Sequence, residues 1–317
     1  MGDASNQSPS TTMPTPNLET PVLFIIFNRP DTTRRVFEAI RAARPRRLFI
    51  AADGPRPHKP GEAERCEATR AITEIIDWPC EVARKYEAVN LGCKQGVSSA
   101  ITWFFNQVEQ GIILEDDCLP HPTFFSFSTE LLTHYADQPE VMMISGDNLL
   151  PPLTNQTESY YFSKYAHIWG WASWRRAWQR YDGEMSSYPE FKRQGTIKQI
   201  FPERKAQYYW TRLFDRIYAG AIDTWDAQWQ YAIFRHGGLS ITPAVNLISN
   251  IGFGPEATHT THLTPEAALA TAAIGPLRHP QTVGRNEAAD RRETKITIPS
   301  WSQRLVTKLT TLFHAKL

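Results

Sequence analysis

Between Pro21 and Asp147, short apolar runs alternate with segments of helical pattern, and this alternation constrains the fold more than any other feature. The runs are VLFIIF (22–27), RLFIAAD (47–53), GIILEDD (111–117) and VMMISGD (141–147), with a more exposed run, EVARKYEAV (81–89), among them. Runs of this length, rich in β-branched and aromatic residues, are typical of strands buried on both faces. The pattern predicts an α/β fold with a mostly parallel, Rossmann-like sheet and helices on both faces.

Polar side chains follow the apolar runs at the points where the predicted strands end. They are Asn28 and Arg29, Asp53 and Gly54, Glu115 to Asp117, and Gly146 with Asp147. Because ligands of open α/β sheets bind beyond the carboxyl ends of the strands, we expect a ligand site at this edge.

Composition divides the chain into five parts. Residues 1–20 are polar and lack an apolar segment, which predicts a flexible leader rather than a signal peptide. The regular alternation covers 21–150, and a half rich in Trp, Tyr and Arg covers 151–263. The Ala-, Pro- and charge-rich stretch 264–297 suggests a linker before a helix at 298–317.

The charge balance and the cysteines limit the class of partner and the compartment. Thirty-four basic side chains offset thirty-three acidic ones, whereas proteins that hold nucleic acid through phosphates usually carry a basic excess. We therefore expect no nucleic-acid partner.

Four scattered cysteines form no CxxC pair and predict free thiols in a reducing compartment. No apolar run near the start reaches the length of a membrane span, so we expect a cytoplasmic protein or one peripheral to a membrane.

The most informative segment is GIILEDDC, in which three adjacent carboxylates end a buried strand. Glu115, Asp116 and Asp117 would repel one another unless a cation or hydrogen-bond donors compensate. Mg²⁺ and Mn²⁺ prefer carboxylate oxygens and keep positions open for substrate phosphates, so the cluster suits a metal–diphosphate complex. The alternative is a solvated acidic turn, or Asp117 capping the helix that follows.

Three further polar residues fall at the same predicted edge. Asp53 could accept hydrogen bonds from a nucleotide base, and Arg29 and Lys94 could face a diphosphate. Taken singly, Asp53 also fits a plain turn and Arg29 a solvated loop. The chain has no G-x-G-x-x-G after its first strand and no GxxxxGK[ST], which disfavours the dinucleotide fold and the P-loop.

Eight segments together carry a resemblance to a known family. They are FNRPD, AADGPR, NLGCKQGVSSAI, GIILEDDC, ISGDN, WGWASW, TWDAQW and NIGFGPEATHT, spread between Pro21 and His262. In these motifs and their order the chain resembles the bacterial nucleotide-diphospho-sugar transferases of the GT-A fold, some of them labelled hemolysin-like glycosyltransferases. It is also similar to the eukaryotic N-acetylglucosaminyltransferase that starts complex N-glycans. The resemblance implies a nucleotide-sugar-binding half at 21–150 and an acceptor and catalytic half at 151–263.

The resemblance implies roles for the residues at the strand ends. Asp53 matches the carboxylate that contacts the nucleotide base, and the loop of Asn28 and Arg29 lies beside it. Asp117 matches the direct ligand of Mn²⁺ or Mg²⁺. The other two members of the triplet, Glu115 and Asp116, are placed near the sugar and the ribose.

The resemblance also implies a catalytic base, Asp226, in the segment TWDAQW. This segment has one residue more before its second Trp than the eukaryotic motif, which affects the placement of Trp229 more than that of Asp226. The flanking Trp225 and Trp229 would exclude water and raise the pKa of the carboxyl group. Asp223 is the rival base, and Asp226 as the cap of a helix at 227–236 is the structural alternative.

Seven of the ten tryptophans lie between Trp169 and Trp229. A helix is expected around 173–180. Trp171, Trp174 and Trp178 share one helical face at i, i+3 and i+7, which indicates core packing for most of the cluster, with one or two tryptophans left to line an acceptor site. His259, in THTTH, matches the late histidine that many GT-A enzymes use as a further metal ligand, although a lone histidine is more often structural.

The sequence therefore predicts a metal-dependent glycosyltransferase that moves a sugar from a nucleotide-diphosphate donor, expected to be a UDP-sugar, to an acceptor hydroxyl. The acceptor is expected to be a carbohydrate or a lipid-linked glycan, and attack from the opposite face inverts the anomeric carbon. Two alternatives stay open: a nucleotidyltransferase that acts on a sugar phosphate, and a non-catalytic sugar-binding accessory protein. Mn²⁺ or Mg²⁺ is the expected cofactor.

The C-terminal helix expected at 298–317 is basic and amphipathic. Its apolar face carries Trp301, Leu305, Leu309, Leu312, Phe313 and Leu317. Such a helix can lie in the interface of the cytoplasmic membrane, where a lipid-linked acceptor would be found, or it can dock on the protein's own core.

Overall fold

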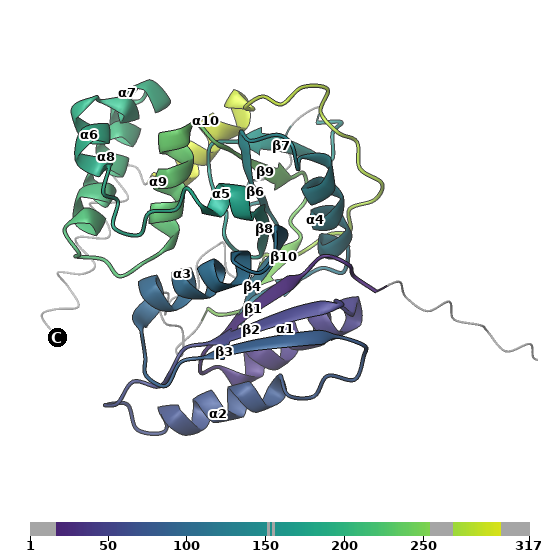
Figure 1. Cartoon of the computed structure of the whole chain (residues 1–317). Coiled ribbons are helices and arrows are strands. Elements are labelled where there is room, and N and C mark those ends of the chain that lie inside the picture. Colours follow the sequence, from purple (N-terminus) through teal and green to yellow (C-terminus); the bar gives the residue numbers. More distant parts are fainter. Residues whose placement is uncertain (1–16, 151–152, 154–155, 254–268, 299–317) are drawn as a thin grey trace, which may run out of the picture.

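The computed structural model describes residues 17–150, 153, 156–253 and 269–298, and its centre is one eight-stranded sheet (Figure 1). The strands are β1 (Val22–Ile26), β2 (Arg47–Ala52), β3 (Glu81–Tyr86), β4 (Gln110–Glu115), β6 (Val141–Ser145), β7 (Tyr160–Ser163), β8 (Trp171–Trp174) and β9 (Leu239–Pro243). Their order is β3-β2-β1-β4-β8-β6-β9-β7, and only β8 and β7 run against the other six. The predicted α/β class with a mostly parallel sheet is confirmed.

Helices cover both faces of the sheet because each central strand is apolar on both sides. On one face, Val22, Phe24 and Ile26 of β1 pack with α1 (Pro30–Ala43) and α4 (Thr123–His134). The opposite face of β1 packs with α3 (Gly92–Phe105), α5 (Arg175–Trp178) and α9 (Asp226–His236). A further helix, α2 (Glu62–Ile72), packs on α1.

The register of the parallel strands determines where their polar ends meet. Ile26 of β1 pairs with Ala52 of β2, and Ile25 pairs with Glu115 of β4. Because neighbouring parallel strands end at the same edge, the residues that follow them lie side by side. A separate antiparallel pair, β5 (Cys118–Pro120) with β10 (Ile248–Asn250), brings the segment after Asn250 against the end of β4.

The part of the chain after residue 150 extends the same sheet and adds a helical lobe. It supplies β7, β8 and β9, so the two halves expected at 21–150 and 151–263 share one sheet. The lobe consists of α6 (Tyr188–Arg193), α7 (Thr196–Ile200) and α8 (Arg204–Tyr218), at the upper left of Figure 1. Its core is aromatic, and α8 buries Ala206, Trp210, Phe214 and Ile217 at helical spacing against α9.

The expected helix at 173–180 is wrong in its first part, because residues 171–174 form β8 and only α5 follows as a helix. Trp171 and Trp174 lie three residues apart on a strand and therefore point to opposite faces of the sheet. Both are buried, as is Trp178, so the core role expected of these three tryptophans holds although their secondary structure differs.

The last described segment also differs from its expectation. Residues 287–297, inside the stretch 264–297 that the sequence suggests as a linker, form α10 (Glu287–Thr297), and the side chain of Asn286 caps it by accepting from the Ala289 N–H. The buried face of α10 consists of Ala289, Asp290, Glu293 and Thr294. Because this face is polar, α10 shows no apolar stripe that a search for amphipathic pattern could detect.

The structure also bears on the thiols and on membrane insertion. All four cysteines are free thiols. None of the helices in the described ranges combines the length and the apolar character needed to cross a membrane.

Candidate functional site

A pocket of about 810 Å³ opens at the carboxyl ends of β1, β2 and β4. Its wall continues through the start of α3, the segment 222–227 that leads into α9, and the residues that follow β10. Residues on both sides of position 150 therefore contribute to it, at the edge where α/β sheets bind their ligands.

The structure brings most of the predicted site residues together in this pocket. Its wall includes Arg29, Asp53, Glu115, Asp116, Asp117 and Asp226. Within the described residues, Asn28 and Lys94 are not part of the wall: the Asn28 amide donates to Glu62 Oε1 at 2.9 Å, and Lys94 Nζ donates to Glu184 Oε1 at 2.7 Å. His259 lies outside the described residues.

Arg29 compensates the acidic triplet from within the protein. Its Nη1 lies 2.9 Å from Asp117 Oδ2, and its Nη2 donates to Asp116 Oδ1. Asp116 Oδ2 also accepts from the Phe27 N–H at 3.2 Å. Gly252 allows this packing, because a Cβ there would lie 2.2 Å from Asp117 Oδ2. Arg29 therefore holds two carboxylates and still faces the pocket.

Burial and neighbouring charge shift the titration of two members of the triplet, Glu115 and Asp116. Desolvation, with repulsion from Asp117 and Asp116, raises the pKa of Glu115 to about 8. Desolvation also raises the pKa of Asp116 to about 6, although the neighbouring Arg29 acts in the opposite direction. A cation at this place would reverse both effects. The protein on its own does not fully neutralise these carboxylates.

The donor set suits a hard divalent cation that shares its coordination with a substrate. Across the described residues, no three side chains of His, Cys, Asp or Glu converge closely enough to form a protein-only metal cage. Mg²⁺, however, is usually bound by one or two carboxylates plus substrate phosphates, and Asp117 faces the pocket with part of its carboxylate exposed. Seven carboxylates and three basic side chains line the pocket, a balance of charge that attracts cations and opposes a bare anion.

Asp53 anchors the loop that follows β3. Its carboxylate accepts from the Gly54 N–H at 2.8 Å, the Leu91 N–H at 2.9 Å and the Asn90 amide at 2.8 Å. Desolvation raises the pKa of Asp53, against the effect of these backbone hydrogen bonds. Asp53 therefore positions Asn90, which also lines the pocket, and the two together present polar atoms at the end of β2.

The two candidate bases, Asp223 and Asp226, are held differently. Asp223 accepts from the Cys93 N–H at 3.0 Å and the Lys94 N–H at 3.1 Å, and so caps the N-terminus of α3 with both oxygens. Asp226 is the first residue of α9, where its Oδ1 accepts from Thr224 Oγ1 and its Oδ2 has no hydrogen-bond partner among the described residues. Trp225 and Trp229 are buried behind it in the core. Of the two, only Asp226 leaves a carboxylate oxygen without a hydrogen bond in the described part of the chain.

Phe27, Arg56, Lys85 and Asn90 are among the wall residues that were not singled out as site residues from the sequence. Arg56 pairs with Glu62 and lies over the Phe27 ring at 5.5 Å, while Lys85 lies near the end of β3 and pairs with Glu87. The signal for Lys85 was available, because β3 runs parallel to β2 and must end at the same edge. Arg56 follows Asp53 within the segment AADGPR.

An aromatic pair forms the part of the wall contributed by the loop before β8 and the segment after β10. The rings of Trp169 and Phe253 meet edge to face, with centroids 5.8 Å apart and an angle of 85°. Trp169 is half-buried, in contrast to the tryptophans of the core. An aromatic face of this kind can stack on the apolar face of a sugar ring.

The similarity of this chain to known proteins is found at the level of structure alone, and it is weak. No protein-family model matches the chain, and no curated protein matches its sequence. Among solved structures, HddC from Yersinia pseudotuberculosis is 10% identical with a TM-score of 0.31, over 50% of this chain and 77% of that one. UDP-glucose pyrophosphorylase complexed with UDP-glucose is 14% identical with a TM-score of 0.25, over 46% and 62%. Scores of this size establish no shared fold, so the description of the fold rests on sheet order and register.

Proposed function

We propose that the chain is a GT-A glycosyltransferase that takes a nucleotide-diphosphate sugar, expected to be a UDP-sugar, and transfers the sugar to an acceptor hydroxyl. One observation carries the proposal: Asp117 and Asp226, far apart in sequence, line the same pocket. A protein that only binds sugars needs no proton-accepting carboxylate opposite an acidic cation site. The acceptor is proposed to be a carbohydrate or a lipid-linked glycan.

The pocket wall offers a place for each part of the donor. Asp53 and Asn90 present polar atoms for the base, and Phe27 contributes a ring to the same wall. The diphosphate would lie nearer the end of β4, where Arg29 and Asp117 face the pocket. Mn²⁺ or Mg²⁺, held by Asp117 and the phosphate oxygens, would offset the charge that develops on the departing diphosphate.

Asp226 and Arg29 have separate roles in the proposed reaction. The acceptor hydroxyl loses its proton to the Asp226 carboxylate, whose Oδ1 is oriented by Thr224. The hydroxyl oxygen forms a bond to the anomeric carbon as the bond from that carbon to the diphosphate oxygen breaks, and the nucleoside diphosphate leaves. Attack from the face opposite the diphosphate inverts the anomeric carbon. Arg29 holds Asp116 and Asp117 in place and adds positive charge beside the leaving group.

The nucleotidyltransferase alternative differs in what it needs after β1. A triphosphate site is usually a glycine-rich basic loop, whereas residues 27–31 read Phe-Asn-Arg-Pro-Asp and lead directly into α1. The single arginine of this loop is paired with two carboxylates. The loop therefore favours a diphosphate donor over a triphosphate.

The test is a panel of nucleotide sugars measured by thermal shift, with Mn²⁺ or with a chelator. A ligand that binds the folded state raises Tm by mass action, so we expect at least one nucleotide sugar to raise Tm with Mn²⁺ and to lose this effect with chelator. With an acceptor present, release of nucleoside diphosphate would support the proposal. Release of pyrophosphate from a nucleoside triphosphate and a sugar phosphate would show the nucleotidyltransferase instead.

A further inference from the structure

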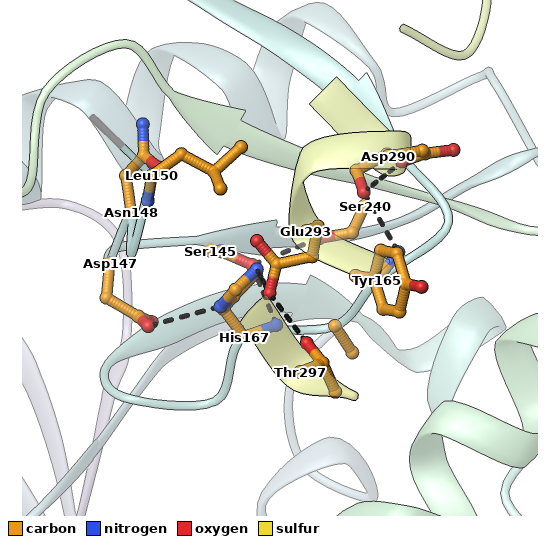
Figure 2. A network of polar contacts seen from close by, with 12 residues as sticks. Ser145, Asp147, Asn148, Leu150, Tyr165, His167, Ser240, Asp290, Glu293 and Thr297 are labelled. Atoms are coloured by element: carbon orange, nitrogen blue, oxygen red, sulfur yellow. Dashed lines mark hydrogen bonds and ion pairs between the residues drawn. The ribbon is translucent and has the colours of Figure 1, made fainter. Parts of the chain in front are cut away.

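A buried polar network lies where α10 meets the loop between β7 and β8 (Figure 2). At its centre His167 Nδ1 lies 3.4 Å from Asp147 Oδ2, and His167 Nε2 lies 3.7 Å from Glu293 Oε1. The three residues are 8%, 2% and 4% exposed. Asp147 follows β6, and Glu293 belongs to α10, so the imidazole joins two elements that are distant in sequence.

The burial of this network requires that its charges remain paired. In the described residues Asp147 has no ion pair besides that with His167, and its Oδ1 has no hydrogen-bond partner. Glu293 accepts only one further hydrogen bond there, from Thr297 at 3.2 Å. A neutral His167 would leave two buried carboxylates without a cation, and a buried charge that loses its partner is strongly destabilising. The bridge therefore favours imidazolium.

The same loop forms part of the pocket wall. Ile168 and Trp169 line the pocket directly after His167. On the side of α9, Gln230 accepts from the Ala166 N–H and donates to the Lys164 carbonyl, each at 2.8 Å. On the side of α10, Tyr165 shares a hydrogen bond of 2.7 Å with Thr294. Loop 164–170 is thus fixed between the helix that carries Asp226 and a helix that does not touch the pocket.

We propose that His167 is a positioning residue: by bridging Asp147 and Glu293 it fixes loop 164–170 on α10 and so sets the position of Trp169 in the pocket wall. The assignment of the Trp169 face to an acceptor sugar rests on the proposed function. The mechanical part of the proposal, that this bridge orders this loop, does not depend on what the pocket binds.

The charges around the bridge determine its response to pH. Besides Asp147 and Glu293, the network includes Asp290 of α10, which pairs with Arg285 at 3.1 Å, and Lys164 of the loop. Burial lowers the pKa of His167, but Glu293 and Asp147 outweigh it and raise the value from 6.5 to about 9. Because the pKa is raised on folding, the stabilisation is complete below about pH 6.5 and is lost as pH rises through about 9.

Amide hydrogen exchange of the full-length chain tests the bridge without any ligand. In His167→Gln we expect protection of the amides of residues 166–170 to fall at least about tenfold, while β2 keeps its protection. The matched control is His279→Gln, which removes another histidine next to a carboxylate, Glu130 at 3.3 Å, away from the pocket. The control should leave loop 164–170 as protected as in the parent. Unchanged protection of the loop in His167→Gln would overturn the proposal.

Hydrogen exchange over a series of pH values distinguishes a role of His167 in positioning the loop from a contribution to the stability of the whole fold. Corrected for intrinsic exchange rates, protection of the loop in the parent should fall between about pH 8 and pH 10, and His167→Gln should show no such step. Should His167→Gln fail to fold, Asp147→Asn with Glu293→Gln removes the two carboxylates and should abolish the step while retaining the fold. A step that persists in this double variant would contradict the proposal.

Steady-state kinetics test whether the His167 bridge affects binding of the acceptor in the pocket. In a parent that turns over a nucleotide sugar, His167→Gln should raise KM for the acceptor at least about fivefold and leave donor binding within twofold. If the parent binds no nucleotide sugar, the proposed function fails, whereas the exchange result still decides the positioning role. Equal acceptor KM values in parent and variant would show that the loop does not serve the acceptor.

Discussion

The two sides of the pocket are held in place by different kinds of contact. On the side of β1, β2 and β4, the polar residues follow strands whose backbone hydrogen bonds determine their position. On the other side, the wall consists of loop 164–170 and the segment before α9, which are held by side chains: Asp223 caps α3, Gln230 holds the loop, and His167 bridges to α10. A substitution on the first side should remove a chemical group, whereas one on the second side can move the wall.

The largest effect is expected on the strand side. Asp117→Ala should abolish metal-dependent binding of the nucleotide sugar and leave the fold intact, because the ladder between β1 and β4 does not depend on this side chain. Calorimetric titration with Mn²⁺ present and absent measures the effect, and circular dichroism checks the fold. Unchanged metal dependence in the variant would refute the assignment of Asp117.

Asp226→Asn should separate acceptor activation from donor binding. It keeps the shape of the side chain and removes the proton acceptor, so turnover should fall at least about a hundredfold while binding of the donor stays close to normal. Asp223→Asn is the matched control and should stay within a few-fold in turnover, because Asp223 serves as a cap of α3. If the two variants exchange these behaviours, Asp223 is the base.

On the second side, substitutions of Trp229 and Trp169 distinguish a tryptophan of the core from a tryptophan of the pocket wall. Trp229 is fully buried, so Trp229→Ala should lower the free energy of unfolding by about 3–5 kcal/mol. Trp169 is half-buried at the pocket, so Trp169→Ala should lower it by less, and its main effect should be a raised KM for the acceptor. Urea unfolding measures the first quantity and steady-state kinetics the second. A larger loss of stability in Trp169→Ala than in Trp229→Ala would contradict this division.

The smallest effect concerns the C-terminal segment 299–317, which lies outside the described residues. Its proposed contact with a membrane is tested by co-sedimentation of the full chain and of a truncation after Ile298, a boundary that keeps α10 whole. The full chain should pellet more strongly with anionic liposomes. Equal pelleting of both forms would exclude the membrane contact.

The strand side of the pocket could be predicted from the sequence because parallel strands end at one edge. That rule predicts that Asp53 and residues 115–117 lie together, as they do in the pocket wall, and applied to β3 it also includes Lys85. It could not show that Arg29 pairs with two acidic neighbours, since this depends on side-chain conformation.

The second side could be predicted only in part. The segment with Asp226 was found by its motif, but the capping of α3 by Asp223 depends on a contact between positions about 130 residues apart in the sequence. The helix expected around 173–180 overlaps the end of β8, because the spacing of three tryptophans there also fits a helical face. α10 was missed because a helix that buries Asp290 and Glu293 has no apolar periodicity.

The position of β8 has a consequence for how the molecule can move and be divided. This strand is hydrogen-bonded to β4 on one side and to β6 on the other, although it comes from the part of the chain after residue 150. A hinge between the two sides of the pocket would have to break these ladders, so any opening of the pocket would come from loops rather than from rotation of rigid bodies. For the same reason, fragments separated at residue 150 should not fold independently, and recombining them with those of a relative would have to preserve the β4–β8 register.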